Sequence, residues 1–371
     1  MKNSFSFIKD GLYYRFLRQR SLLQPTKRLL VFILITWLPL LLLLMMQGKE
    51  QALLLAIIPN IRFFVAAPLL IFSEGFADRI LINVAQEFLH TGVIREEDHH
   101  KFENAIKKNS LLHNSNLPEI FILMVAYIVS FASLKTYSLH LGSEWLPSQP
   151  IIIWYFMVSK PLFIFLTVRW MWITVLWNKF LWHMSCLDLD LNPTHPDRAA
   201  GLRFVSNAQF AFVGVVFSFS ATVSASELKA LSIHKTFLEA INNSIFVVLI
   251  IAFLWLIAPM FLFTRQLISV QYRGQLEYGA LGQEYVVQFA KKWLDIKNSP
   301  ERENLLGNPD ISVLADIQSS FSIIDKMRIV PMDIRTMAIL IGLSILPLAS
   351  VGLSKALPKE LFKRTIEILL G

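Results

Sequence analysis

The sequence predicts an all-α fold, a polytopic transmembrane helical bundle with a helical cytoplasmic cap. The chain has 371 residues, of which 54% are hydrophobic and 17% charged, whereas soluble domains are less apolar and more charged. Its mean hydropathy is +0.52. Several apolar stretches are long enough for membrane helices and lack the alternation of strands. The single cysteine, Cys186, excludes an internal disulfide framework and a cysteine-based metal cluster.

Seven stretches meet or approach the roughly 20 apolar residues that a helix needs to cross a bilayer core. They are 29–46, 63–74, 117–134, 159–182, 204–225, 245–264 and 337–353. The apolar run 151–182 is too long for one perpendicular span. Because serine caps helices and proline suits the first turn, we expect the fourth helix to start at Ser159 to Pro161. Residues 151–158 would then form a separate interfacial or re-entrant piece.

The distribution of basic residues predicts a cytoplasmic N-terminus. Residues 1–28 hold seven basic residues against one acidic residue. With that end inside, the cytoplasmic segments hold 24 basic residues and the external segments hold nine. The tail after residue 353 is unusually basic for an external segment, so the side of the C-terminal tail stays open. Its basic residues are Lys355, Lys359, Lys363 and Arg364.

Four regions follow from these spans. Residues 1–28 are a basic N-terminal arm, in which 5–24 read as an amphipathic surface helix. Residues 29–264 are a bundle of six spans with a cytoplasmic insertion at 80–116. Residues 265–335 form a cytoplasmic helical hairpin, and 336–371 hold the seventh span and the tail.

The hairpin prediction rests on two apolar stripes at helical spacing. The first stripe is Tyr278, Leu281, Tyr285, Phe289 and Trp293. A loop follows, and Asp310 can cap a second helix. The second stripe is Leu314, Ile317, Phe321, Ile324 and Met327. Such a pair must pack against other loops of the chain or against another subunit.

Two polar clusters face the predicted cytoplasm. The insertion holds a histidine and carboxylate cluster, which is either a solvated helix face or a metal site: His90, Glu96, Glu97, Asp98, His99 and His100. The second cluster lies in the loop 187–201 between spans four and five. Its candidate residues at the cytoplasmic mouth are Asp188, Asp190, His195, Asp197 and Arg198.

The loop 187–201 has two interpretations. In the structural one, Thr194 caps a helix whose first turn holds Pro196 and Asp197, where proline and an acid are favoured. In the functional one, His195 and the aspartates form a cation or proton site at a pore mouth, or Asp197 and Arg198 form an ion-pair lock.

Ionisable residues at membrane depth are the other candidates, because such groups usually face a bundle interior or water. Arg169 lies about 13 Å into the fourth span and Glu74 about 17 Å into the second, at 1.5 Å per residue. We therefore expect Glu74 and Arg169 to face each other or to share a cavity, with Asp78 one turn below Glu74. The alternative places Glu74 and Asp78 at the headgroups, with Arg169 extending to the interface.

The sequence also resembles a family of uncharacterised bacterial polytopic inner-membrane proteins. The resemblance rests on THPDRAAGL (194–202), GQLEYGALGQEYVVQFAKKW (274–293), LGNPDISVLADIQSSF (306–321), MRIVP (327–331) and IRFFVAAPLLIFSE (61–74). Ala200 stands where that family typically has glycine. The resemblance implies a bacterial inner-membrane location and supplies no catalytic residues.

Three functions fit these features. The first is passage of an ion or small solute through a homo-oligomeric channel or a simple transporter. The second is a receptor-like scaffold that recruits a cytoplasmic protein through 265–335. The third is a membrane-embedded enzyme that acts on lipid with His195 and Asp197. Motifs for nucleotide binding, zinc proteolysis and serine hydrolysis are absent, so we expect no cofactor and no enzyme activity of those classes. The expected partners are the lipid bilayer and further copies of the chain, not nucleic acid.

Overall fold

The computed structural model describes residues 5–139, 148–233, 237–294 and 309–356, and this part of the chain is an all-α helical bundle. Within it, six helical segments are long and apolar enough to cross a membrane. They are Pro25–Met45, Ile57–His90, Asn116–Leu134, Gln149–Ser185, Arg203–Leu228 and Asn243–Trp293. A shorter apolar helix, Ile334–Ala349, covers most of the predicted seventh span, 337–353. The predicted fold class is therefore confirmed.

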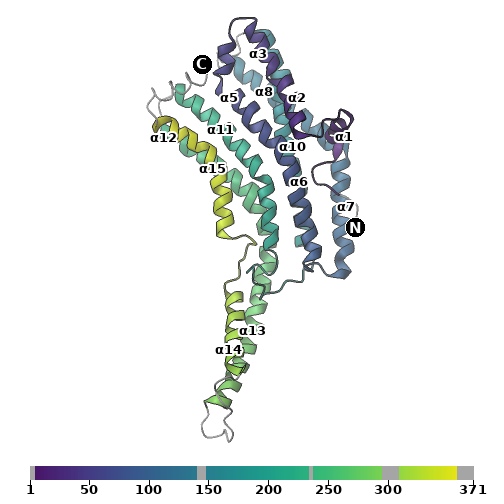
Figure 1. Cartoon of the computed structure of the whole chain (residues 1–371), viewed down its shortest axis with the longest axis vertical. Coiled ribbons are helices and arrows are strands. Elements are labelled where there is room, and N and C mark those ends of the chain that lie inside the picture. The colour runs from purple at the N-terminus through teal and green to yellow at the C-terminus, as the bar shows by residue number, and fades with distance from the viewer. Residues whose placement is uncertain (1–4, 140–147, 234–236, 295–308, 357–371) are drawn as a thin grey trace.

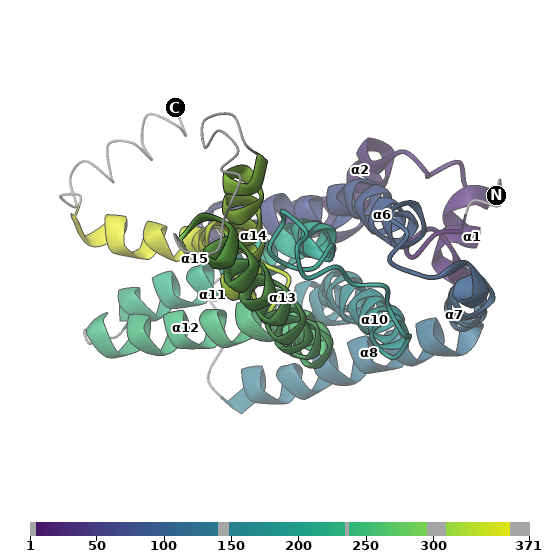
Figure 2. The same cartoon turned by 90° about the horizontal axis from the view of Figure 1, so that it is seen from below.

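The helices form two groups (Figures 1 and 2). The first group contains α2 (Pro25–Thr36), α3 (Leu38–Met45), α6 (Ala67–His90), α8 (Asn116–Leu139) and α10 (Lys160–Ser185). The second contains α11 (Val213–Ile233), α12 (Phe237–Ala252) and α15 (Ile334–Ala356), which pack on one another. The short helix η4 (Arg203–Phe212) and the start of α11 lie against α6 and join the groups.

Hydroxyl side chains of α11 serve this packing. Ser218 Oγ donates a hydrogen bond of 3.0 Å to the Ala66 carbonyl, and Ser224 Oγ donates one of 2.9 Å to the Pro347 carbonyl. A Cβ added at Gly214 would lie 2.1 Å from Ser73 Oγ, so glycine permits the close approach of α11 and α6. Small residues have this role wherever membrane helices cross closely.

Three spans contain a π-helical turn just before a proline. The turns are η1 (Arg62–Ala66), η3 (Tyr155–Ser159) and η5 (Phe253–Ile257). Pro68, Pro161 and Pro259 follow each turn by two residues. Proline lacks an N–H and clashes with the preceding turn, and a widened turn relieves that clash without ending the helix.

The predicted break at Ser159 is therefore wrong. The helix α9 (Gln149–Trp154) continues through η3 into α10, so residues 151–158 belong to the fourth span. The second span likewise begins at Ile57, in α5 (Ile57–Ile61), after the short helix α4 (Glu50–Leu54). Glu74 is consequently about 25 Å and Arg169 about 30 Å from the start of its span, at 1.5 Å per residue. Glu74 and Arg169 lie near the level at which α2 and α8 begin. Both are further from the start of their spans than the sequence predicted.

The predicted pair of amphipathic helices forms a hairpin that projects from one end of the bundle (Figure 1). It consists of α13 (Thr264–Trp293) and α14 (Pro309–Asp325). The helix α13 continues the sixth span through the 3-10 turn η6 (Ala258–Phe263). The Tyr285 hydroxyl donates a hydrogen bond of 2.8 Å to the Asp310 carbonyl, and Trp293 Nε1 donates one of 3.1 Å to the Asp310 carboxylate. Asp310 thus ties the two helices together.

The N-terminal arm differs from its prediction. Within residues 5–24 only α1 (Gly11–Gln19) is helical, whereas residues 5–10 are irregular and enter the bundle beside α7 (His99–Asn114). Phe7 and Ile8 are buried among helices α6 and α10. Ile8 is fully buried, so it does not lie on a membrane surface. The predicted surface helix over 5–24 is therefore wrong for residues 5–10. The basic tail after residue 353 has no described side chains.

Candidate functional site

Glu74 is the centre of a buried charge cluster in the first helix group. Its side chain is 1% exposed, and Arg169 Nη1 lies 2.7 Å from its Oε1. The Tyr14 hydroxyl donates a hydrogen bond of 2.7 Å to Glu74 Oε2, which also pairs with Arg28 Nη1. Glu119, also buried, lies with its Oε1 3.8 Å from Arg169 Nε. We call Arg28, Glu74, Glu119 and Arg169 the charge cluster; its two guanidinium groups balance its two carboxylates.

The charge cluster holds residues 5–14, which we call the N-terminal segment. Arg169 Nη2 donates a hydrogen bond of 2.7 Å to the Ile8 carbonyl, and the Tyr13 N–H donates one of 2.6 Å to Glu119 Oε2. The arginine therefore binds α6 and the segment at once. A hydrogen bond made by a charged group in a dry site is strong, because no water competes for it.

Asp78 anchors the segment one helical turn further along α6. The Ser6 hydroxyl donates 2.6 Å to Asp78 Oδ1, and Lys9 Nζ lies 3.0 Å from Oδ2. Glu74 and Asp78 share a helix face because they are four residues apart. Gly11 makes the turn into α1 with φ +92°, and a Cβ there would lie 2.6 Å from Glu119 Oε1. Glycine thus lets the chain pass close to that carboxylate.

Two titratable groups beside the charge cluster are held neutral. Burial, with the Glu74 carboxylate nearby, raises the pKa of Tyr13 to about 12. Burial, with the Arg169 cation nearby, lowers the pKa of His113 to about 4. The neutral His113 accepts the Asp10 N–H through Nε2 at 3.2 Å. The segment therefore depends on an imidazole that carries no proton on that nitrogen near pH 7.

The loop 187–202 is a second polar feature, and it lies at the neck where α13 leaves the bundle. Asp197 organises it by accepting three backbone N–H groups, from Ala199 at 2.8 Å, Gly201 at 3.1 Å and Arg203 at 3.1 Å. His195 Nδ1 lies 2.8 Å from Asp197 Oδ1. Burial alone would raise the pKa of Asp197, but these hydrogen bonds outweigh burial and lower it.

Several predictions about this loop need correction. No helix starts at Thr194, whose hydroxyl donates to Asn192 at 2.8 Å; Asp197 instead caps η4 through the Arg203 N–H. Asp197 and Arg198, both in the described part, form no ion pair, because the loop turns at Arg198 with φ +56°. The ion-pair lock is therefore wrong. Ala200, at the position where glycine was expected, also has a positive φ of 53°.

The remaining mouth residues lie at the edge of the same loop. Asp188 pairs with Arg95 at 3.0 Å, and the Asp190 N–H donates to the Val93 carbonyl at 2.8 Å. No hydrogen bond or ion pair within the described residues joins the loop to the charge cluster. The described part also contains no group of three or more histidine, cysteine or acidic residues placed to hold a metal ion.

The structure thus brings Glu74 and Arg169 into direct contact and leaves Asp78 beside them, while the five mouth residues form a separate feature. Sequence reasoning missed Arg28, Tyr14 and Glu119. Glu119 was detectable, since it is the only acidic residue in 116–134. Arg28 and Tyr14 carried no such signal, because an arginine and a tyrosine at a span boundary usually lie in the headgroup region.

No protein-family model, no curated protein and no solved structure matches this chain. The resemblance described above stays a prediction. The function must therefore be argued from the charge cluster and the elements around it.

Proposed function

We propose that this polytopic membrane protein passes an ion or a small solute across a bacterial inner membrane, as a homo-oligomeric channel or a simple transporter. In this proposal the N-terminus is cytoplasmic and the N-terminal segment is a plug that closes the bundle. The observation that carries it is the charge cluster, in which Arg169 binds both Glu74 and the backbone of Ile8.

Burial of four charges is costly for a protein whose only need is to stay in a membrane. An apolar core of the same shape would stabilise the bundle equally well. The charges therefore favour a structure that opens, because water that enters the bundle can hydrate separated guanidinium and carboxylate groups but gains nothing from exposed apolar side chains. Asp78 and His113 add polar anchors that fix the closed position of the plug.

Flux measurements with purified protein in liposomes test this function. We expect low flux in the wild type and higher flux in Glu74→Gln, because the amide removes the counter-charge of Arg28 and the nearest carboxylate of Arg169 and so frees the plug. Glu87→Gln, an exposed position on the same helix, is the matched control and should behave as the wild type. Lys9→Gln should raise flux less, because it removes only the ion pair that the half-exposed Lys9 makes with the buried Asp78.

Absence of flux for all common ions and small solutes, at any voltage or pH and in all these variants, would overturn the proposal. Folding of each variant is checked by its elution as a single species in detergent.

A scaffold function is the second candidate, and the projecting hairpin favours it. Leu276, Leu281 and Val286 of α13 are about half exposed, at 57%, 51% and 49%. A protein that co-purifies with the wild type, and is lost when these residues are changed to serine, would favour the scaffold. A lipid-acting enzyme has less support, because both oxygens of Asp197 are occupied by backbone N–H groups of its own loop.

A further inference from the structure

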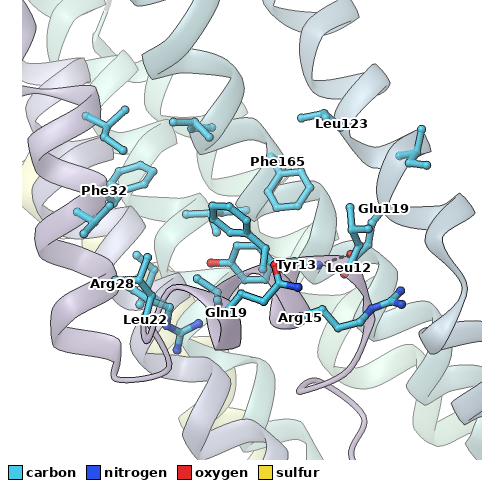
Figure 3. Close-up of a pocket in the computed structure, with 18 residues that line it drawn as sticks. Leu12, Tyr13, Arg15, Gln19, Leu22, Arg28, Phe32, Glu119, Leu123 and Phe165 are labelled. Atoms are coloured by element: carbon cyan, nitrogen blue, oxygen red, sulfur yellow. Dashed lines mark hydrogen bonds between the residues drawn. The ribbon is translucent and has the colours of Figure 1, made fainter.

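A groove of about 710 Å³ opens on the outside of the first helix group, next to the charge cluster. Helices α2 and α8 form its walls, α10 forms its floor, and α1 closes the end nearest the charge cluster (Figure 3). Its volume falls in the range of roughly 300–1,000 Å³ that is typical of small-molecule sites. The interior is lined by apolar side chains from five helices, including Phe32, Ile71, Leu123, Phe165 and Leu166.

The polar groups of the groove gather at its closed end. Arg15 and Gln19 from α1, and Arg28 from α2, line that end (Figure 3). The buried Nε of Arg28 has no hydrogen-bond partner among the described residues. The acidic group there, Glu119, is turned to the Tyr13 N–H at 2.6 Å. Arg28 pairs with Glu74, whereas Arg15 donates only to neutral acceptors, the Gly11 and Asn114 carbonyls and Asn116 Oδ1. Among the described residues the Arg15 cation forms no ion pair, so the closed end carries a positive charge without an acidic partner.

The sequence around the closed end of the groove is also positively charged. Residues 11–49 contain six basic residues and no acidic residue. The helix α1 also leaves Leu12 and Phe16 about half exposed, at 44% and 52%, where they line the groove. A basic helix with an exposed apolar edge is typical of an element that lies at the surface of an anionic bilayer.

We propose that this groove binds one anionic phospholipid of the leaflet that α1 faces. The acyl chains lie between α2 and α8 on α10, and the phosphate lies at the closed end by Arg15 and Arg28. An acyl chain fits the groove because the walls are apolar along their length, and the anionic headgroup fits the closed end because its donors are cationic. This site is independent of whether the protein passes a solute.

Native mass spectrometry of the purified protein tests the site with phosphatidylglycerol and phosphatidylcholine of the same acyl chains. Both lipids have the anionic phosphate, but phosphatidylcholine also carries a choline cation, which the basic end of the groove repels. We therefore expect one phosphatidylglycerol per chain to bind about tenfold more tightly than phosphatidylcholine. Arg15→Gln should reduce this preference. Arg79→Gln, an exposed arginine on α6 outside the groove, should leave it unchanged.

A steric pair tests the acyl-chain part. Leu123→Trp fills the groove and should reduce binding of both lipids, whereas Met124→Trp, on the next position of α8 and outside the groove, should not. Photoreactive phosphatidylglycerol, used on the unmodified protein, should label α8 and α10 next to the groove in preference to the exposed Phe246 of α12. Equal binding of the two lipids, equal effects of the two tryptophans, or labelling without this preference would overturn the proposal.

Discussion

At the scale of single residues, the charges of this protein stabilise one another out of contact with water. Arg169 is 2% exposed and Glu74 1% exposed, and neither has bulk solvent to replace its partner. Arg28 and Tyr14 also bind Glu74, and Arg169 also donates to the Ile8 carbonyl, while the buried Arg169 Nε has no hydrogen-bond partner among the described residues. Loss of Glu74 leaves Arg28 unpaired and Arg169 with only Glu119 at 3.8 Å, and loss of Arg169 leaves Glu74 with Arg28 alone. A buried ion that loses a partner in this way is in the costly state for a protein interior.

We expect Glu74→Gln and Arg169→Gln each to lower the free energy of unfolding by about 3–5 kcal/mol. The double variant should be less damaged than the sum of the two, by about 0.5–3 kcal/mol, because the two side chains are in contact. Denaturant titration in detergent measures all three, with Glu87→Gln as the control. Strict additivity would contradict the direct coupling of Glu74 and Arg169.

His113 makes stability depend on pH. Its pKa is about 4 in the fold and near 6.5 when the chain is unfolded, so the unfolded state binds more protons between these values. Stability is then lost as the pH falls from about 6.5 towards 4, and the loss attributable to His113 is about 2 kcal/mol at pH 5. Thermal unfolding of the wild type and of His113→Gln over this range measures the difference. A difference between the two proteins that does not change with pH would contradict the assignment.

The sequence revealed part of this site. A lone acid and a lone arginine in apolar runs are conspicuous, and their depths predicted that Glu74 and Arg169 would meet. The segment that lies between the helices was not predictable in this way, because the amphipathic pattern of residues 5–24 fits a membrane surface as well as a bundle interior. Arg28 was hidden for a related reason, since its position at the start of the first span also suits the headgroup region.

At the scale of elements, periodicity was a good guide and helix ends were not. The apolar stripes of α13 and α14 predicted the hairpin, because each stripe is the apolar face of a helix and needs another surface to pack against. The break predicted at Ser159 was wrong because the serine and Pro161 were taken as the start of a helix, whereas a π turn before the proline allows the helix to continue through both residues. The same arrangement at Pro68 and Pro259 shows that proline widens these spans without ending them.

The neck of the hairpin offers a prediction at this scale. A Cβ added at Gly274 would lie 2.7 Å from Pro193 Cβ, in the loop that Asp197 organises, whereas one at Gly279 would lie 3.7 Å from Phe321. Gly274→Ala should therefore lower the free energy of unfolding by about 1–3 kcal/mol, the usual cost of overpacking. Gly279→Ala is the matched control on the same helix and should be neutral or slightly stabilising. Thermal unfolding of the two variants compares them directly; equal melting temperatures would contradict close packing at the neck.

At the scale of the whole molecule, two groups of membrane helices meet along α6 and α11, and a hairpin projects from their common end (Figure 1). The N-terminal segment occupies the first group and is held there by charged side chains of α6, α8 and α10, and the Arg28 guanidinium of α2 lies over the Tyr14 ring, 5.6 Å from its centroid. Four helices are thus tied to one short segment. Release of that segment would leave these charged groups exposed to whatever enters the bundle.

Cysteine labelling at Ile8 tests this account most directly. The variant Ile8→Cys is made with Cys186→Ser, since Cys186 is the single cysteine of the chain and is exposed. A water-soluble maleimide should react slowly with Cys at position 8 in the otherwise unchanged protein and much faster when Glu74→Gln is added. Arg18→Cys, at an exposed position of α1 outside the groove, should react quickly in both backgrounds. Fast reaction at position 8 with Glu74 intact, or a rate that does not change when Glu74 is neutralised, would contradict the claim that the charge cluster holds the N-terminal segment inside the bundle.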